Sequence, residues 1–140
     1  MNEMIDIIKI FGFRVHIDPS IEKEGLEGFY YNKKIVLSQP NIKTFLHELC
    51  HAMEDNIGIL NSKEKNIGEL TAYIYTLMMY ENVNNPIKII ASSLMNFYTS
   101  RFNPKYLPTS NVYKAIKRAS SIYQLEVSEK IRNVIHGRKS

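Results

Sequence analysis

Hydrophobic positions in the first forty residues repeat first at helical and then at strand spacing. Apolar residues three and four apart suit one face of a helix, and alternation with polar residues suits a half-buried strand. Asn32-Lys33 between the last two strands suits a two-residue hairpin turn, though less well than Asn-Gly because lysine disfavours a positive φ. The charged segment 20–27 is expected to be a loop. The predicted elements are a helix over residues 2–11 and strands over 13–17, 28–31 and 34–37.

The rest of the chain repeats its apolar residues only at helical spacing. Pro40 suits the first turn of the helix that follows the last strand. Breaks containing asparagine and proline separate the later helices, and Gly137 ends the last one. Ser128 can cap a separate final segment, so the last apolar stretch is either one long helix or two. The predicted helices cover residues 38–56, 63–80, 86–102 and 109–137.

This order of elements favours an α+β domain. We expect a small, mostly antiparallel sheet of about three strands, packed against the helix over 38–56 and followed by a helical C-terminal half. A length of 140 residues is typical of one domain. Within this single domain, 1–140, residues 28–80 form the expected core and residues 86–140 a helical cover.

Composition limits the cellular compartments in which the protein is expected. Cys50 is the sole cysteine, which excludes an internal disulfide. The longest uncharged apolar-rich run has 11 residues, from Leu70 to Tyr80, and a membrane span needs ~18. Glu3 and Asp6 occupy the place where a signal peptide would be positively charged. We therefore expect a protein of the reducing cytoplasm that does not cross a membrane.

The net charge of +4 is unevenly distributed. Residues 1–100 hold 9 Lys/Arg and 12 Asp/Glu, whereas residues 101–140 hold 9 and 2. Such a segment can attract nucleic acid or an acidic partner, although a solvated lysine-rich helix face is the commoner explanation. Its apolar stripe at 112, 116, 119 and 123 must be buried, on the rest of the domain or on a second copy. The basic residues expected at the solvent-exposed rim are Lys114, Lys117, Arg118, Lys130 and Arg132.

One cluster, His47-Glu48-Leu49-Cys50-His51, has the form His-Glu-x-x-His. Residues i and i+4 of a helix lie one above the other, so both imidazoles can bind one metal ion from adjacent turns. Glu48 lies beside that face, within reach of a metal-bound water. The composition gives about 0.009 such matches by chance. The motif therefore predicts a metal site, and two fortuitous histidines on a surface helix are the weaker alternative.

A catalytic zinc site needs a third protein ligand, with the fourth position left to water. Glu69 is the strongest candidate, because it lies near the start of the next helix, 18 positions after His51, and the apolar residues after it predict packing on the core. Glu64 better fits a carboxylate favoured by the helix dipole. Cys50 points elsewhere on the helix and is expected to be buried. Two histidines are distant in the sequence, His16 and His136.

The motif and the helix after it resemble the ImmA/IrrE-like metallopeptidases. That family has His-Glu-Leu-x-His and then a helix of the form Glu-Ala-Asn-x-Phe-Ala-x-x-Leu-Leu-Met-Pro. Here Glu69 falls on the family's ligand glutamate, Tyr73 on its Phe and residues 77–79 on its Leu-Leu-Met. The resemblance covers about residues 28–80. The departures, none of which removes a ligand, are Leu70, Thr71, Ile74 and Tyr80. The resemblance implies a zincin-like fold with one zinc ion per chain, bound by His47, His51 and Glu69.

These residues suit metal-assisted hydrolysis of a peptide bond. Zinc would lower the pKa of its bound water towards ~7, and Glu48 would take the proton and pass it to the leaving amine. The resemblance implies a protein substrate such as a helix-turn-helix repressor of a mobile element or stress regulon. The alternative is a non-catalytic metal-containing protein whose basic segment, 101–140, contacts DNA or an acidic protein. The intact Glu48 favours the enzyme, because a binding protein has no need of a general base.

Two further features bear on the substrate. A second donor to the oxyanion is often a tyrosine or histidine, but each candidate tyrosine is better explained as an ordinary core or surface aromatic. An extended peptide can pair with the strand over 34–37 if that strand lies at a sheet edge. The tyrosines of the C-terminal half are Tyr98, Tyr106 and Tyr113.

Overall fold

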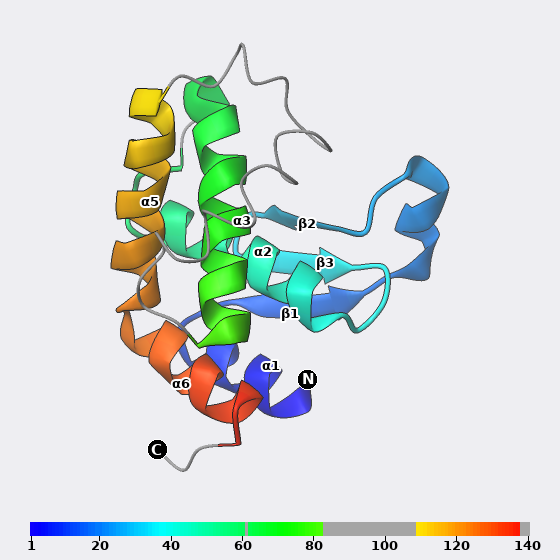
Figure 1. The fold of residues 1–140 in the computed structure, drawn as a ribbon. Helices are drawn as coiled ribbons and strands as arrows, with labels where there is room; N and C mark the ends of the chain where they lie inside the picture. The colour runs from blue at the N-terminus through cyan, green and yellow to red at the C-terminus, as the bar shows by residue number, and fades with distance from the viewer. Residues whose placement is uncertain (61, 83–108, 138–140) are drawn as a thin grey trace.

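A computed structural model describes residues 1–60, 62–82 and 109–137. The described chain forms helices packed around one small sheet (Figure 1). The α+β class is therefore confirmed, while the helix expected over 86–102 lies outside the described residues. In chain order the elements are α1 Asn2–Ile10, β1 Arg14–Ile17, the 3-10 helix η1 Pro19–Glu24, β2 Gly28–Tyr31, β3 Lys34–Leu37, α2 Ile42–Asn56, the 3-10 helix η2 Ser62–Glu64, α3 Lys65–Glu81, α5 Thr109–Tyr123 and α6 Glu126–Ile135.

The sheet has three strands in the order β1-β3-β2. β2 and β3 are antiparallel, but β1 and β3 are parallel, so the expectation of a mostly antiparallel sheet is wrong: the sheet is mixed. Ile17 and Gly28 both lie opposite Leu37, so the chain leaves β1 and enters β2 at the same end of the sheet. The connection crosses only the end of β3. The hairpin after β2 then places β3 between β2 and β1. Strand β3 therefore runs parallel to β1 although no crossover helix connects the two.

The predicted hairpin between β2 and β3 is confirmed. Both residues of its turn have positive φ, 47° for Asn32 and 65° for Lys33, which is the two-residue turn whose twist matches the strands. The backbone N–H of Lys33 donates to the Tyr30 hydroxyl at 3.0 Å. This contact helps to hold a lysine in a conformation that usually favours glycine.

Helix α2 begins later than the sequence predicts. Its N-cap is Asn41, whose side chain accepts a hydrogen bond from the Thr44 backbone N–H at 3.1 Å. The backbone N–H of Ser38 donates to the carbonyl of Glu27 at 2.9 Å, which prolongs the sheet pairing beyond β3. Pro40 therefore precedes the helix instead of lying in its first turn.

Helices α3 and α5 lie side by side, and α6 packs against α3 and α1 (Figure 1). Of the apolar stripe predicted on α5, Ala119 and Tyr123 are buried, whereas Val112 and Ile116 are half-buried against the core. The fully enclosed residues of α5 are Ala115, Ala119 and Ile122. The last apolar stretch forms two helices, but Ser128 does not cap the second. It is buried inside α6, where its hydroxyl donates to the Ile122 carbonyl at 2.7 Å. Among the described residues, no helix combines the length and apolar character that a membrane crossing requires.

Candidate metal centre

Helix α2 turns both motif histidines to the same side. The ring centroids of His47 and His51 lie 5.0 Å apart, as one helical turn requires. The opposite side of α2 is anchored in the core by Phe45, Leu46 and Leu49, each fully buried. A helix fixed in this way holds the two imidazoles on rigid backbone.

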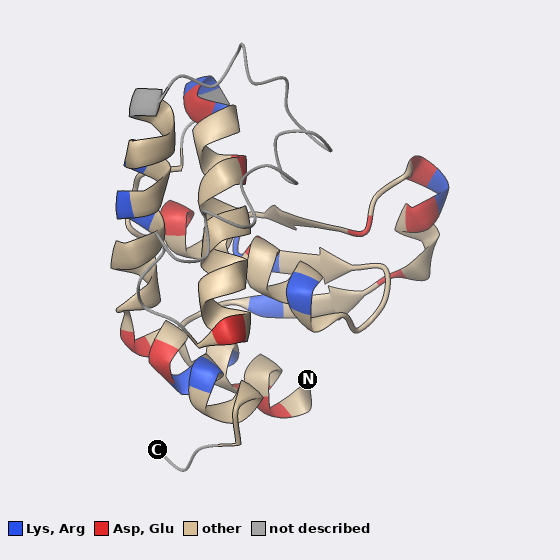
Figure 2. Ribbon diagram, viewed as in Figure 1, with Lys and Arg blue, Asp and Glu red and all other residues tan. Residues whose placement is uncertain are grey.

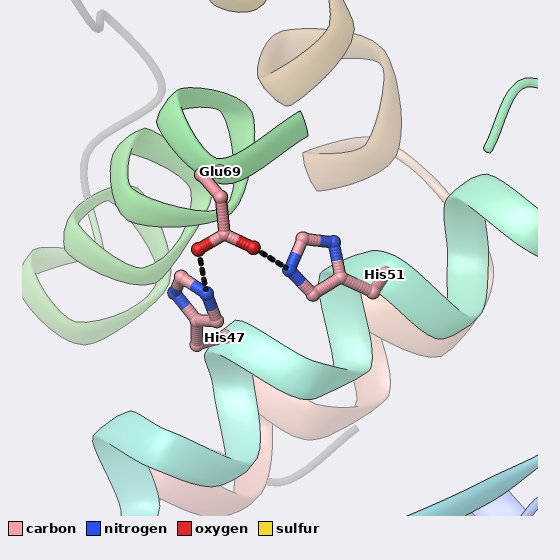
Figure 3. Close-up of side chains that lie close together, drawn as sticks. All are labelled: His47, His51 and Glu69. Carbon is pink, nitrogen blue, oxygen red and sulfur yellow. Dashed lines mark hydrogen bonds and ion pairs between the residues drawn. The ribbon is translucent and has the colours of Figure 1, made fainter. Parts of the chain in front are cut away.

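Glu69 on α3 faces the histidine pair, with one carboxylate oxygen directed at each ring (Figure 3). Its Oε2 lies 3.1 Å from Nε2 of His47, and its Oε1 lies 3.0 Å from Nε2 of His51. One ligand atom from each residue falls within 4.8 Å of the others. The prediction that Glu69 lies opposite the two histidines is confirmed.

The donor set of His47, His51 and Glu69 fits a zinc ion. Two imidazole nitrogens and one carboxylate are ligands that zinc takes in catalytic sites, and its ~2.0–2.1 Å bonds separate tetrahedral ligand atoms by about 3.3 Å. The nitrogen–oxygen separations of 3.1 Å and 3.0 Å run to different oxygens of Glu69, and one ligand atom from each residue lies within 4.8 Å of the others. Each ring nitrogen of His51 also has a carboxylate oxygen within 3.2 Å. The ring therefore either carries two protons or shares a cation with Glu69.

The charges at the site favour a cation where the three side chains meet. Burial lowers the pKa of His51, but hydrogen bonds to the carboxylates of Glu54 and Glu69 outweigh burial and raise the pKa to about 10. Burial raises the pKa of Glu69, yet its hydrogen bonds with His47 and His51 bring that pKa well below the usual range. In the metal-free protein His51 is thus a cation paired with Glu69, and a metal ion bound at Nε2 would take the place of the proton there.

Glu48, the motif glutamate, lies in the wall of the groove that contains the three ligands. Its side chain is buried, with 8% of the residue exposed. Burial raises the pKa of this carboxyl group, and the neighbouring imidazoles only partly oppose that effect. Glu48 is thus placed beside the ligands without being one of the three side chains that converge.

The groove has a volume of about 1480 Å³ and runs between the histidine face of α2, helix α3 and strand β2. Gly28, Phe29 and Tyr30 of β2 line it, as does Tyr73 of α3. Within the described residues, β2 pairs with β3 alone, so β2 is an edge strand next to the site. The strand over 34–37, which could pair with a peptide only if it lay at a sheet edge, is central.

Glu54 is a residue of the site that sequence reasoning missed. It is fully buried on α2, and its Oε1 lies 3.2 Å from Nδ1 of His51. Its other oxygen, Oε2, has no hydrogen-bond partner among the described residues and lies 3.8 Å from Nη1 of Arg118. The sequence contained one indication of this contact: Glu54 follows His51 by three residues, and that spacing puts both side chains on one helix face.

The other candidates from the sequence lie elsewhere. His136 directs its Nε2 to the Met79 carbonyl at 2.9 Å, and His16 is an exposed residue of β1. Cys50 is fully buried, which raises the pKa of its thiol. Tyr113 is 61% exposed, with Lys117 over its ring. Two tyrosines considered for the oxyanion lie outside the described residues, Tyr98 and Tyr106.

The basic residues of α5 and α6 do not form one solvated face. Lys114 and Arg118 donate to the Glu64 carboxylate at 2.5 Å and 2.9 Å, and Arg132 lies over the Tyr123 ring, 3.8 Å from its centroid. The side chain of Arg118 is only 14% exposed. In Figure 2 helix α5 carries only basic residues, whereas α6 carries both signs. The expectation of five basic residues at an open rim is therefore wrong for Arg118, because acidic partners hold it in the wall of the groove.

Comparison of the chain with protein-family models, curated proteins and solved structures finds no match.

Proposed function

We propose that the protein is a zinc-dependent endopeptidase. The observation that carries this proposal is the convergence of His47 and His51 from α2 with Glu69 from α3. Two imidazoles and one carboxylate leave a coordination position for water or substrate, as in catalytic zinc sites. When bound there, zinc supplies a Lewis acid that activates water and polarises a carbonyl.

The location of Glu48 supports a role as the general base. Glu48 lines the same groove as the three ligands, and its carboxylate is buried beside them. In this proposal Glu48 accepts a proton from the attacking water and returns it to the departing amine, which general acid–base catalysis requires of one well-placed group.

Strand β2 supports a peptide as the substrate. Its residues Gly28 to Tyr30 line the groove, and an edge strand offers backbone donors and acceptors to an extended chain. Space is tight at Gly28, where an added Cβ would lie 2.8 Å from Cγ2 of Thr44. A glycine thus lets β2 lie close to α2, which places the strand edge next to the metal ligands.

The kind of protein cleaved rests on the family resemblance. The ImmA/IrrE-like pattern in residues 47–79 supports a cytoplasmic protein substrate of the helix-turn-helix repressor class. The competing function, contact with DNA through the C-terminal helices, gains no support from α5, because Glu64 engages both Lys114 and Arg118.

Ligand substitutions test the metal site. We expect the protein to bind one zinc per chain, and His47→Ala, His51→Ala and Glu69→Ala each to lose most of it, because two ligands hold zinc far more weakly than three. Elemental analysis after dialysis measures this, with Asp55→Asn on the same helix as the control. Full zinc content in Glu69→Ala would remove Glu69 from the ligand set.

Glu48→Gln tests the chemistry. The amide has nearly the same shape but cannot accept the proton, so we expect the variant to keep its fold and zinc while cleavage falls at least ~100-fold. The measurement is hydrolysis of a quenched-fluorescence peptide library by zinc-loaded protein. Equal cleavage by the parent and Glu48→Gln would contradict this role. Zinc binding without cleavage of any peptide or candidate repressor would favour the non-catalytic alternative.

A further inference from the structure

The carboxylate of Glu54 is enclosed where α2, α3 and α5 meet. Glu54 has no exposed surface, and a Cβ added at Gly68 of α3 would lie 3.8 Å from Oε2 of Glu54. Burying a charged carboxylate is costly unless other charges and hydrogen bonds compensate it. The charged groups that do so here are the His51 imidazole and the Arg118 guanidinium, and the Cys50 thiol also donates to Oε1 at 3.8 Å.

The two nitrogens of His51 face different carboxylates. Nε2 points at Glu69, the shared ligand position, at 3.0 Å, whereas Nδ1 points at Oε1 of Glu54 at 3.2 Å. A metal ion that replaces the proton on Nε2 leaves a neutral imidazole with one N–H, and the hydrogen bond from Nδ1 to Glu54 keeps that N–H on Nδ1 and the lone pair on Nε2. Glu54 thus selects the tautomer and ring orientation in which Nε2 can bind a cation.

Arg118 reaches Glu54 from the other side. Its Nη1 lies 3.8 Å from Oε2 of Glu54, and its Nη2 donates to Glu64 at 2.9 Å. Two carboxylates therefore fix one guanidinium, whose planar shape suits such paired contacts. Since Arg118 belongs to α5, this contact links the C-terminal helices to the ligand face of α2.

We propose that Glu54 is a positioning residue that orients His51 for metal binding, and that Arg118 holds Glu54 in place from α5. This inference rests on the proposed metal site. It gives the C-terminal helices a part in that site beyond covering the core. The link runs from α5 through a buried ion pair between Arg118 and Glu54 to the ligand His51.

Glu54→Gln is the direct test, since the amide keeps the shape and removes the charge. We expect its zinc affinity, measured by competition with a chromophoric chelator, to fall roughly 10- to 100-fold. Asp55→Asn, the same change on the next residue, serves as the control and should match the parent. If the parent binds no zinc, the proposed function fails. If the parent binds zinc and Glu54→Gln binds it equally well, this inference alone is overturned.

A double-mutant cycle tests the part of Arg118. We expect Arg118→Met to weaken zinc binding several-fold in the parent and to have no effect in Glu54→Gln, because Arg118 acts through Glu54. Lys117→Met on the same helix is the control. Equal effects of Arg118→Met in both backgrounds would overturn this part.

Folding is measured separately, by thermal melts of the metal-free variants. A purely structural role would lower the melting temperature and leave the zinc affinity of the folded protein unchanged, which would also overturn the inference. Should Glu54→Gln not fold, Glu54→Asp replaces it. The shorter side chain keeps the charge near Arg118 but withdraws it from Nδ1, so the same fall in affinity is expected, and parent-like affinity would again overturn the inference.

Discussion

At the scale of single residues, the site depends on which carboxylate contacts which histidine, lysine or arginine side chain. Glu69 meets both imidazoles and Glu54 meets one of them. Glu64, five residues before Glu69, instead accepts from Lys114 and Arg118. The sequence distinguished Glu69 from Glu64 through position in a predicted helix. It contained no sign of the two cations that hold Glu64, because they come from α5.

The pH dependence of stability tests the Glu64 ion pairs. Hydrogen bonds from Lys114 and then Arg118 lower the pKa of Glu64 in the folded protein, whereas the unfolded value is about 4.3. A lowered folded pKa contributes stability above the unfolded pKa, and that contribution disappears as pH falls through the folded pKa. Glu64→Gln should therefore melt below the parent at pH 7 and approach it below about pH 4. A difference in melting temperature that does not change with pH would contradict this assignment.

At the scale of elements, local hydrogen bonds decided where helices begin and how strands connect. Helix α2 begins after Asn41 because that side chain caps the Thr44 N–H. Pro40 alone does not identify the start, since proline also suits an extended segment before a cap. The hairpin needed only its two-residue turn, which is local, and it was predicted correctly. The pairing of β1 with β3 joins strands that are separated in the sequence, and the sequence did not predict it.

The cap at Asn41 can be measured directly. We expect Asn41→Ala to lower the free energy of unfolding by about 1 kcal/mol, because the Thr44 N–H loses its acceptor. Asn41→Asp keeps an oxygen in the same place and should stay close to the parent. Urea denaturation of the two metal-free variants gives the comparison. Equal stability of the alanine and aspartate variants would show that the side chain is not an effective cap.

At the scale of the whole molecule, buried polar contacts join the C-terminal helices to the rest of the domain. The hydroxyl groups of Tyr75 on α3 and Ser128 on α6 lie 2.8 Å apart, and both residues are fully buried. The contact of α6 with α1 also brings the two ends of the described chain together (Figure 1). These contacts support a single cooperative unit.

Ser128→Ala tests that unit. It leaves the Tyr75 hydroxyl buried without its partner, so we expect a loss of about 1–3 kcal/mol in the free energy of unfolding. Tyr75→Phe with Ser128→Ala should cost less than the two single changes together, since neither hydroxyl is then stranded. Urea denaturation followed by far-ultraviolet circular dichroism should show one transition. A separate early transition would show that the C-terminal helices unfold as an independent unit.

The sequence by itself determined what local geometry can encode. Helical spacing placed His47 and His51 on one face, and alternation together with a two-residue turn located the β2–β3 hairpin. Packing between distant segments decided the rest: the central position of β3, the burial of Glu54 and the reach of Arg118 into the groove. The physical reason is the distance along the sequence between the residues that interact. A dihedral preference or an i, i+4 contact is set by neighbouring residues, whereas an ion pair between α2 and α5 exists only once α3 has brought the two helices together.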